Sequence, residues 1–349
     1  MATRSKVQLT AHKNGERKLK KYAIYGVGAA LVDTEVAVED EFLSTAEIKK
    51  GVMTLVDQPR QAELLSLLSS DSSNIIRKCG GSVCNSMVAA SQLGAKTFFS
   101  GKVARDNDGE LYADDLMACG VTFQSASPES GVTGKCLVMV SSDAERTMNT
   151  FLGVSEDLSM REIDQSALAT SQWLYLEGYL VTDQRRAEMA ESLVDMAREN
   201  GVRVAVSLSD PFVVELFGGS LRQIIGSGID MLFCNIQEAL TFTGAASIDG
   251  AAAALAKYAS TFVITNGDQG ALFFDGNNTH TTHGIAVNAI DTNGAGDMFA
   301  GAFLYAVTSG RKTQWALDFA NYCASRVVQQ FGPRLSDADF DEIRRAYDL

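Results

Sequence analysis

The strongest constraint on the fold is a regular alternation of apolar and amphipathic segments between residues 173 and 265. The apolar segments have the length of buried strands, and the segments between them have the length and periodicity of helices. Strands are expected at 173–177, 202–208, 231–234 and 261–265, and helices at 184–199, 212–225 and 251–258. Apolar strands that alternate with helices indicate βαβ units on a parallel sheet. We therefore predict a three-layer α/β body.

The N-terminal half adds elements that do not follow this alternation. Helices are expected at 60–69, 83–93 and 109–118, and strands at 22–28, 97–103, 121–123 and 135–141. Residues 31–38 alternate apolar and polar side chains, as a strand with one face in water does. This stretch and the one near 135–150 are predicted to meet as a small sheet that covers a crevice at the strand ends. We expect one domain, residues 22–349, with a discontinuous lid from about 30–45 and 120–152.

Charge and cysteine content exclude several classes of protein. Asp and Glu number 43 against 30 Lys and Arg, so the chain should repel nucleic-acid phosphates. No apolar run approaches the ~18 residues of a membrane span, so no membrane insertion is expected. Six cysteines without a C-x-x-C pair indicate reduced thiols in a cytoplasmic protein. Only three histidines are present, which disfavours a zinc enzyme or a Ser-His-Asp hydrolase.

The first 21 residues differ in charge from the rest of the chain. They contain seven basic residues and one acidic residue, without the apolar centre of a signal peptide. We expect residues 1–21 to form a disordered basic tail. Docking of this tail on an acidic neighbour is the alternative.

The most informative segment is Asp291-Thr292-Asn293-Gly294-Ala295-Gly296-Asp297, which precedes an apolar helix expected over 298–307. Small residues at 294–296 let the main chain approach a ligand, and the first-turn amides of a helix lack intrahelical partners. These amides and the helix dipole favour a phosphate. Beside it, a carboxylate with the usual pKa of ~3.9 can accept a proton from an attacking hydroxyl. The alternative is that Asp291 or Asp297 only caps the helix.

This segment resembles the C-terminal signature of the ribokinase (PfkB-type) family of carbohydrate and nucleoside kinases. The family's glycine signature resembles Gly80-Gly81-Ser82-Val83-Cys84-Asn85, and its Asn-x-x-Glu motif matches Asn235-Ile236-Gln237-Glu238. Within the family, similarity to adenosine kinases rests on Gly26-Val27-Gly28 with Asp33, Thr133-Gly134-Lys135-Cys136, Arg146 and Ser209-Asp210-Pro211-Phe212. The resemblance covers about residues 22–335. It implies a ribokinase-like α/β fold with a mostly parallel central sheet, a small β-sheet lid, and ATP-dependent phosphorylation of an alcohol.

The resemblance also implies a set of acceptor-binding residues. They are Asp33, Gly81, Ser82, Asn85, Tyr179 and Phe212. A carboxylate and a carboxamide can hydrogen-bond neighbouring ribose hydroxyls, and a glycine lets the main chain join them. Tyr179 and Phe212 follow two strand ends, where aromatic rings would stack on a purine. Read alone, Asp33 could be an exposed charge, and each aromatic residue could belong to the core.

On the phosphate side, the resemblance makes Asp297 the general base and Gly294, Ala295 and Gly296 the anion hole. Arg146 would neutralise charge on the transferred phosphate, although by itself it reads as a surface arginine. The residues implied in ATP binding are Asn235, Thr265, Gly267, Gly270 and Asn321. Asn235 and Glu238 would hold Mg²⁺ through water. Without the resemblance, Asn235 and Glu238 read as a helix cap, and the glycines near 267–270 as a hairpin turn.

One departure from the family leaves the choice of acceptor open. Positions 29 and 30 are both alanine, where many adenosine kinases carry Asn-Pro, and alanine side chains cannot hydrogen-bond a base. We expect phosphorylation of a nucleoside 5′-hydroxyl, first of all adenosine to AMP as in purine salvage. Inosine, guanosine and a sugar are the alternative acceptors, and a silent nucleoside sensor is the alternative to an enzyme. The enzyme would act on a small molecule as a monomer or homodimer.

Overall fold

The computed structural model describes residues 20–69, 75–125, 130–226 and 228–349. Among these, nine strands form a large sheet in the order β14-β13-β12-β11-β10-β9-β1-β5-β6. In chain order the strands are β1 (Tyr22–Val27), β5 (Thr97–Ser100), β6 (Thr122–Gln124), β9 (Ser171–Glu177), β10 (Arg203–Ser207), β11 (Ile229–Asn235), β12 (Ala259–Thr265), β13 (Ala271–Phe274) and β14 (Thr279–Thr282). The pairs from β6 to β12 are parallel, and β13 and β14 add antiparallel strands at one edge.

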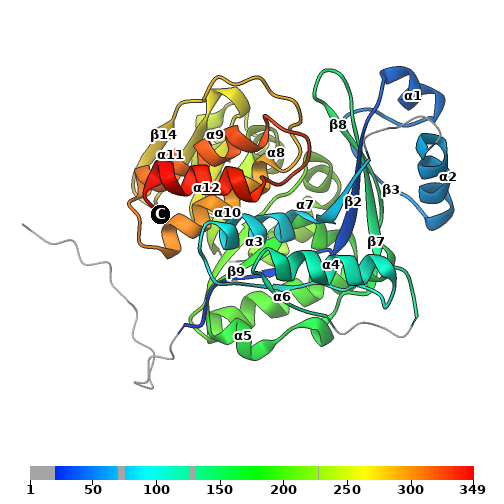
Figure 1. Cartoon of the computed structure of the whole chain (residues 1–349). Helices are drawn as coiled ribbons and strands as arrows, with labels where there is room; N and C mark the ends of the chain where they lie inside the picture. The colour runs from blue at the N-terminus through cyan, green and yellow to red at the C-terminus, as the bar shows by residue number, and fades with distance from the viewer. Residues whose placement is uncertain (1–19, 70–74, 126–129, 227) are drawn as a thin grey trace, which may run out of the picture.

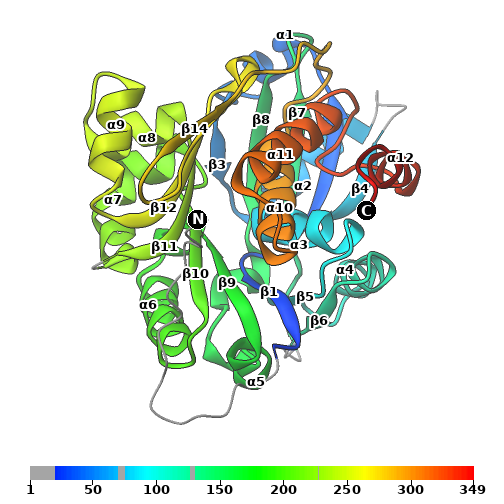
Figure 2. The same ribbon diagram turned by 90° about the vertical axis from the view of Figure 1, so that its left-hand side faces the viewer.

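Helices cover both faces of this sheet, and Figure 2 shows the three layers edge-on. One face is covered by α3 (Ser82–Gln92), α4 (Asn107–Ala118), α10 (Ala295–Thr308), α11 (Thr313–Val327) and α12 (Asp337–Tyr347). The other is covered by α5 (Gln165–Ala169), α6 (Gln184–Glu199), α7 (Pro211–Ile225), α8 (Ile236–Thr243) and α9 (Ile248–Leu255). Short 3-10 helices are η1 (Gly153–Asp157), η2 (Met160–Glu162), η3 (Gly178–Thr182) and η4 (Gly267–Gln269). The predicted ribokinase-like three-layer α/β body is confirmed.

Five further strands form a smaller sheet in the order β3-β8-β7-β2-β4 (Figure 1). They are β2 (Leu31–Ala37), β3 (Met53–Leu55), β4 (Ile76–Gly80), β7 (Gly134–Val140) and β8 (Arg146–Phe151). The helices α1 (Asp40–Thr45) and α2 (Gln58–Ser69) pack on its outer face, around Val36, Leu64 and Leu137. The predicted pairing of the stretches near 31–38 and 135–150 is therefore present, as β2 beside β7.

The expectation that β2 has one face in water is wrong. Asp33, Thr34 and Glu35 are all buried, with 6%, 6% and 2% of their surface exposed. Val36 faces α1 and α2, whereas alternate residues such as Leu31 and Asp33 face a cavity between the small sheet and the large sheet. Polarity on this strand therefore marks a face that is turned toward the body of the protein, not toward solvent.

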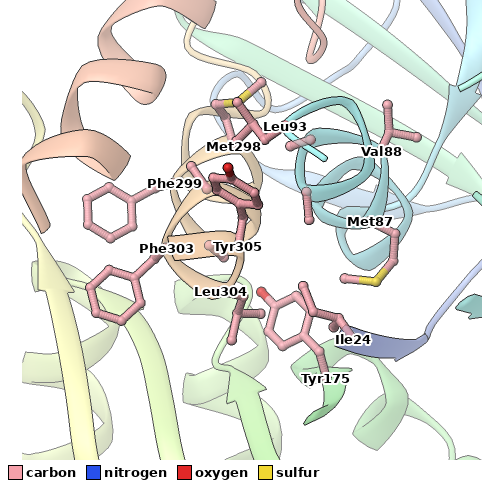
Figure 3. Close-up of a cluster of buried hydrophobic side chains, with 14 of the residues drawn as sticks. Ile24, Met87, Val88, Leu93, Tyr175, Met298, Phe299, Phe303, Leu304 and Tyr305 are labelled. Atoms are coloured by element: carbon pink, nitrogen blue, oxygen red, sulfur yellow. The ribbon is translucent and has the colours of Figure 1, made fainter. Parts of the chain in front are cut away.

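Helices α3 and α10 pack closely against each other beside the cavity. Figure 3 shows α10 beside α3, with Phe299 and Phe303 on the side of α10 away from Met87 of α3 and with Tyr175 of the large sheet below. Gly301 permits this approach, because a Cβ at this position would lie only 2.4 Å from the carbonyl oxygen of Ser86. The first turns of the two helices are thereby brought together.

Residues 1–19 of the basic tail lie outside the described residues. None of the described helices combines the length and apolar character needed to cross a lipid bilayer.

We expect Gly301→Ala to lower the free energy of unfolding by about 1–3 kcal/mol, because the added methyl group must separate α3 from α10. Gly219→Ala is the matched control, since Gly219 is an exposed glycine of α7 with no atom within 4 Å of the new Cβ. It should leave stability unchanged or raise it by up to about 1 kcal/mol. Urea unfolding of both variants measures the difference, and equal effects would contradict the packing argument.

Candidate functional site

A cavity of about 440 Å³ lies between the small sheet and the carboxyl ends of the parallel strands. Its walls come from the small sheet (Leu31, Asp33, Arg146), from strand ends of the large sheet (Asn235, Thr265) and from the start of α10. Parallel α/β sheets commonly bind ligands at this edge, and the volume is in the usual range for a small-molecule site. The cavity is therefore the candidate functional site.

The start of α10 forms one end of the cavity through Gly294, Ala295, Gly296 and Asp297. Gly294 is the N-cap residue, with φ of 76°, and a Cβ there would lie 2.5 Å from the Pro333 main chain. Only glycine fits this position without strain. Neither Asp291 nor Asp297 caps α10, so the capping alternative is wrong. The N–H of Ala295 donates to the carbonyl oxygen of Thr292 over 3.4 Å, whereas those of Gly296 and Asp297 have no partner among the described residues and can receive an anion from the cavity.

Asp297 is held by two hydrogen bonds from α3. Ser82 Oγ donates to Asp297 Oδ1 over 2.6 Å, and Asn85 Nδ2 donates to Oδ2 over 3.0 Å. Burial raises the pKa of Asp297 above its ordinary value, while these hydrogen bonds and the nearby Arg146 oppose the rise. The sequence-based assumption of an unperturbed pKa is therefore wrong. A carboxylate with a raised pKa is a better proton acceptor than an ordinary aspartate.

Asn85 is itself oriented by Arg334, a residue that the sequence analysis missed. The buried Arg334 donates from Nε to Asn85 Oδ1 over 2.9 Å and from Nη1 to Asp115 Oδ2 over 3.0 Å. Because Arg334 can only donate, it fixes which end of the Asn85 amide faces Asp297. A chain of hydrogen bonds thus runs from Asp115 through Arg334 and Asn85 to Asp297.

Asn293 connects the small sheet to the loop that precedes α10. Its Oδ1 accepts from Arg146 Nη1 of β8 over 3.1 Å, and its Nδ2 donates to Glu35 Oε1 of β2 over 2.9 Å. Asp291 shapes the same loop by accepting from the main-chain N–H groups of Asn293 and Gly332. Arg146 is thereby held over the cavity, near Asp297 and Glu238.

Asp33 lies on the small-sheet wall of the cavity. Its main chain is paired with β4 and β7, but its carboxylate accepts no hydrogen bond from the described residues. Burial, reinforced by the neighbouring Glu35, raises the pKa of Asp33 well above its ordinary value. Gly81, at φ of 96°, brings the main chain close to the same region, since a Cβ there would meet the carbonyl oxygen of Ala29. An unpartnered acceptor directed into a cavity favours a ligand that supplies hydroxyl donors.

Asn235 and Glu238 lie at the junction of β11 and α8 and line the cavity. They form a reciprocal capping box, in which Asn235 Oδ1 accepts from the N–H of Glu238 and Glu238 Oε2 accepts from the N–H of Asn235. Asn235 and Glu238 therefore do cap α8, as the alternative interpretation predicts. The carboxylate of Glu238 nevertheless lies on the cavity wall. Burial raises the pKa of Glu238 to about 7.

Three residues selected from the sequence do not line the cavity: Phe212, Gly270 and Asn321. Phe212 is on the surface of α7 with 36% of its area exposed, and Asn321 donates to the carbonyl oxygen of His283. The other selected residues line it, including Tyr179, Thr265 and Gly267.

Glu177, at the end of β9, was not selected from the sequence and also lines the cavity. Its carboxylate accepts from the N–H groups of Ala29 and Val83 over 2.8 and 3.2 Å, and burial raises its pKa to about 7. A single glutamate after an apolar strand has no sequence pattern that marks it.

No cluster of three or more His, Cys, Asp or Glu side chains suited to a metal ion occurs among the residues that the structure describes. Asn235 and Glu238 remain the nearest match to a magnesium site, because Mg²⁺ in phosphate-binding sites keeps several waters and needs only one or two protein carboxylates.

The chain is similar to known kinases in sequence and in fold. The family model described as pfkB family carbohydrate kinase matches residues 65–339. The crystal structure of adenosine kinase from Sinorhizobium meliloti is 31% identical, with a TM-score of 0.87 over 93% of this chain and 99% of that chain. A probable sugar kinase from Rhizobium etli CFN 42 is 30% identical, with a TM-score of 0.88 over 95% and 99%. Adenosine kinase 2 from Arabidopsis thaliana is 25% identical over 88% of this chain and 94% of its own.

The buried Glu35 makes stability depend on pH. Its pKa is raised from 4.5 to about 7 by burial, and its Oε2 has no partner among the described residues. Between these values the native state holds a proton that the unfolded state releases, so stability falls as pH rises toward 7. Glu35→Gln removes this pH-dependent loss of stability, because glutamine does not ionise, and its side-chain oxygen can still accept from Asn293.

We therefore expect the stability of Glu35→Gln relative to the natural chain to increase between pH 5 and pH 8, by up to about 3 kcal/mol. Urea unfolding at several pH values measures it. Glu188→Gln, which changes an exposed carboxylate on α6, is the matched control. A stability difference that stays constant across this pH range would contradict the assignment.

Proposed function

The chain belongs to the pfkB family of carbohydrate kinases, and we propose that it is a nucleoside kinase that transfers the γ-phosphate of ATP to a 5′-hydroxyl, with adenosine as the reference acceptor. The observation that carries this proposal is the pairing of Asp297, at the free amides of α10, with the unpartnered Asp33 across one cavity. Relatives named adenosine kinases support the choice of a nucleoside.

In the proposed reaction, Asp297 accepts the proton of the 5′-hydroxyl as its oxygen attacks the γ-phosphorus. The new O–P bond forms while the bond to the leaving oxygen breaks, which releases ADP. The first-turn amides at Gly294, Ala295 and Gly296 stabilise the charge on the equatorial oxygens, together with Arg146. Closure of the small sheet over the cavity would exclude water, which otherwise competes for the phosphate.

The ribose is the part of the acceptor that the cavity is best equipped to hold. Asp33 has free acceptor capacity for the 2′- and 3′-hydroxyls, and Asn85 Nδ2 has a second N–H beyond the one it gives to Asp297. Gly81 lets main-chain groups join them, and Ser82 fixes the carboxylate of Asp297. Tyr179 supplies an aromatic surface for the base from the cavity wall, and Phe212 would be a second one only at the entrance.

ATP would enter on the side of Thr265 and Gly267, with Gly270 and Asn321 farther out toward the adenine. Glu238 and Asn235 would hold Mg²⁺ through water, and the ion would offset the phosphate charge. Glu238 must be ionised for this role, and its pKa of about 7 places that change near neutral pH.

A sugar kinase is the second candidate, because the probable sugar kinase from Rhizobium etli CFN 42 is 30% identical over 95% of this chain. ADP release with MgATP and a panel of adenosine, 2′-deoxyadenosine, ribose and fructose separates the two. Turnover with adenosine supports the nucleoside kinase. Turnover with free sugars alone would replace it by the sugar kinase, and no turnover would favour a sensor.

Asp297→Asn should lower kcat by at least about 100-fold, because the variant cannot accept the hydroxyl proton. The amide keeps the volume and an acceptor for Ser82, so the Kd for adenosine should stay within about 5-fold. Coupled ADP assays and calorimetric titration measure these two quantities. Retained turnover would remove Asp297 from the proton transfer.

Asp33→Ala should weaken adenosine binding by about 10-fold or more and leave the KM for ATP unchanged, because it removes the acceptor for the ribose hydroxyls. It should also narrow the preference for adenosine over 2′-deoxyadenosine. Asp143→Ala is the control, an exposed aspartate beside the same sheet that pairs with Lys50. Equal losses for adenosine and ATP would indicate a folding defect and contradict the ribose assignment.

A further inference from the structure

Arg186 lines the cavity from α6 although only 3% of its surface is exposed. Arginine side chains are rarely buried to this extent unless an acidic partner accompanies them. No sequence pattern marks Arg186, because an arginine near the start of an amphipathic helix is usually solvated. The mechanism proposed above does not use it either.

The guanidinium of Arg186 lacks partners. Its one hydrogen bond with the described residues runs from Nη2 to Thr182 Oγ1 over 3.0 Å, although the group has five N–H donors. Nε is buried without a partner, and no carboxylate of the described residues lies within ion-pair distance. Burial lowers the pKa of Arg186, while the more distant carboxylates of Asp183 and Glu177 oppose this. A ligand with acceptor atoms would complete this environment.

Thr182 Oγ1, which accepts from Arg186, donates to the carbonyl oxygen of Tyr179 over 2.9 Å, so Arg186 lies on the part of the cavity wall that carries this aromatic residue. Arg186 neighbours Glu177, which accepts from the N–H of Ala29, four residues before Asp33 on the way into the small sheet. Phosphate chemistry is assigned to the α10 end and ribose binding to Asp33, so the Arg186 wall is left for the base. At Ala29 itself the side chain provides no hydrogen-bonding group.

The carboxamides on the cavity wall are already committed elsewhere. Asn85 is bonded to Asp297 and Arg334, Asn235 to Glu238, and Asn293 to Arg146 and Glu35. These amides cluster at the α10 and α8 ends of the cavity. The base end therefore presents a guanidinium and no free carboxamide.

Base recognition distinguishes these two groups. A carboxamide matches the donor and acceptor pair at N6 and N7 of adenine, whereas a guanidinium fork matches the two acceptors O6 and N7 of a 6-oxopurine. On the basis of the proposed nucleoside kinase function, we propose that Arg186 donates to O6 and N7 of the acceptor base and makes 6-oxopurine nucleosides, such as inosine and guanosine, substrates beside adenosine.

The test compares kcat/KM for inosine and adenosine in the natural chain and in Arg186→Gln, which places a carboxamide where the guanidinium was. The natural chain should phosphorylate inosine, and the variant should lower the inosine-to-adenosine ratio by about 5- to 150-fold. The KM for ATP should not change. A ratio within 2-fold of the natural one, or a natural chain that uses adenosine but not inosine, would overturn the assignment.

Two further variants keep the result interpretable. Arg185→Gln is the matched control, because Arg185 is the exposed neighbour on α6 and pairs with Asp157 at the surface; its ratio should equal that of the natural chain. If Arg186→Gln does not fold, Arg186→Lys retains the charge without the planar fork and should still lower the ratio. A natural chain inactive with every nucleoside overturns the proposed function itself, whereas an active enzyme with an unchanged ratio overturns only the role of Arg186.

Discussion

The hydrogen bonds from Ser82 and Asn85 to Asp297 join the first turns of α3 and α10, and the rest of the site depends on this contact. It requires two helices that begin at the same edge of the large sheet and approach closely, which Gly301 permits. It also places an acidic side chain within the positive end of a helix, where the free amides are open to an anion. Arg334 holds the amide of Asn85 in one orientation by donating to its oxygen, while the amide nitrogen faces Asp297.

The small sheet supplies the opposite wall, and its polar residues are held at a cost in stability. Burial raises the pKa of Asp33, and it raises the pKa of Glu35 to about 7. Such groups destabilise a fold, and proteins keep them chiefly at functional sites. Asn293 compensates in part, because its amide bonds Glu35 on one strand and Arg146 on another, and so ties the sheet to the loop before α10.

The sequence predicts the order of elements well where side-chain pattern alone decides it, as in the apolar strands β9 to β12 and in α6, whose observed bounds are the expected 184–199. It also selects Asp297, which lines the cavity, since small residues before a helix indicate a close approach of the main chain to a ligand. It does not find Arg334, which meets Asn85 across 249 positions of the chain, or Arg186, because an isolated arginine looks solvated until packing covers it. For residues 31–38 the prediction of a solvent-exposed face was wrong because burial depends on packing. An alternating pattern shows that the two faces of a strand differ, and it does not show that one of them is exposed to solvent.

The most direct test of the central claim is to identify the phosphorylated atom. Phosphorus NMR of the product from MgATP and adenosine should show a single 5′-phosphate ester, and 5′-deoxyadenosine should give no ester at all. Phosphate on a 2′- or 3′-oxygen, or release of free phosphate without any ester, would contradict the arrangement of Asp33 and Asp297 around a nucleoside whose 5′-hydroxyl faces α10.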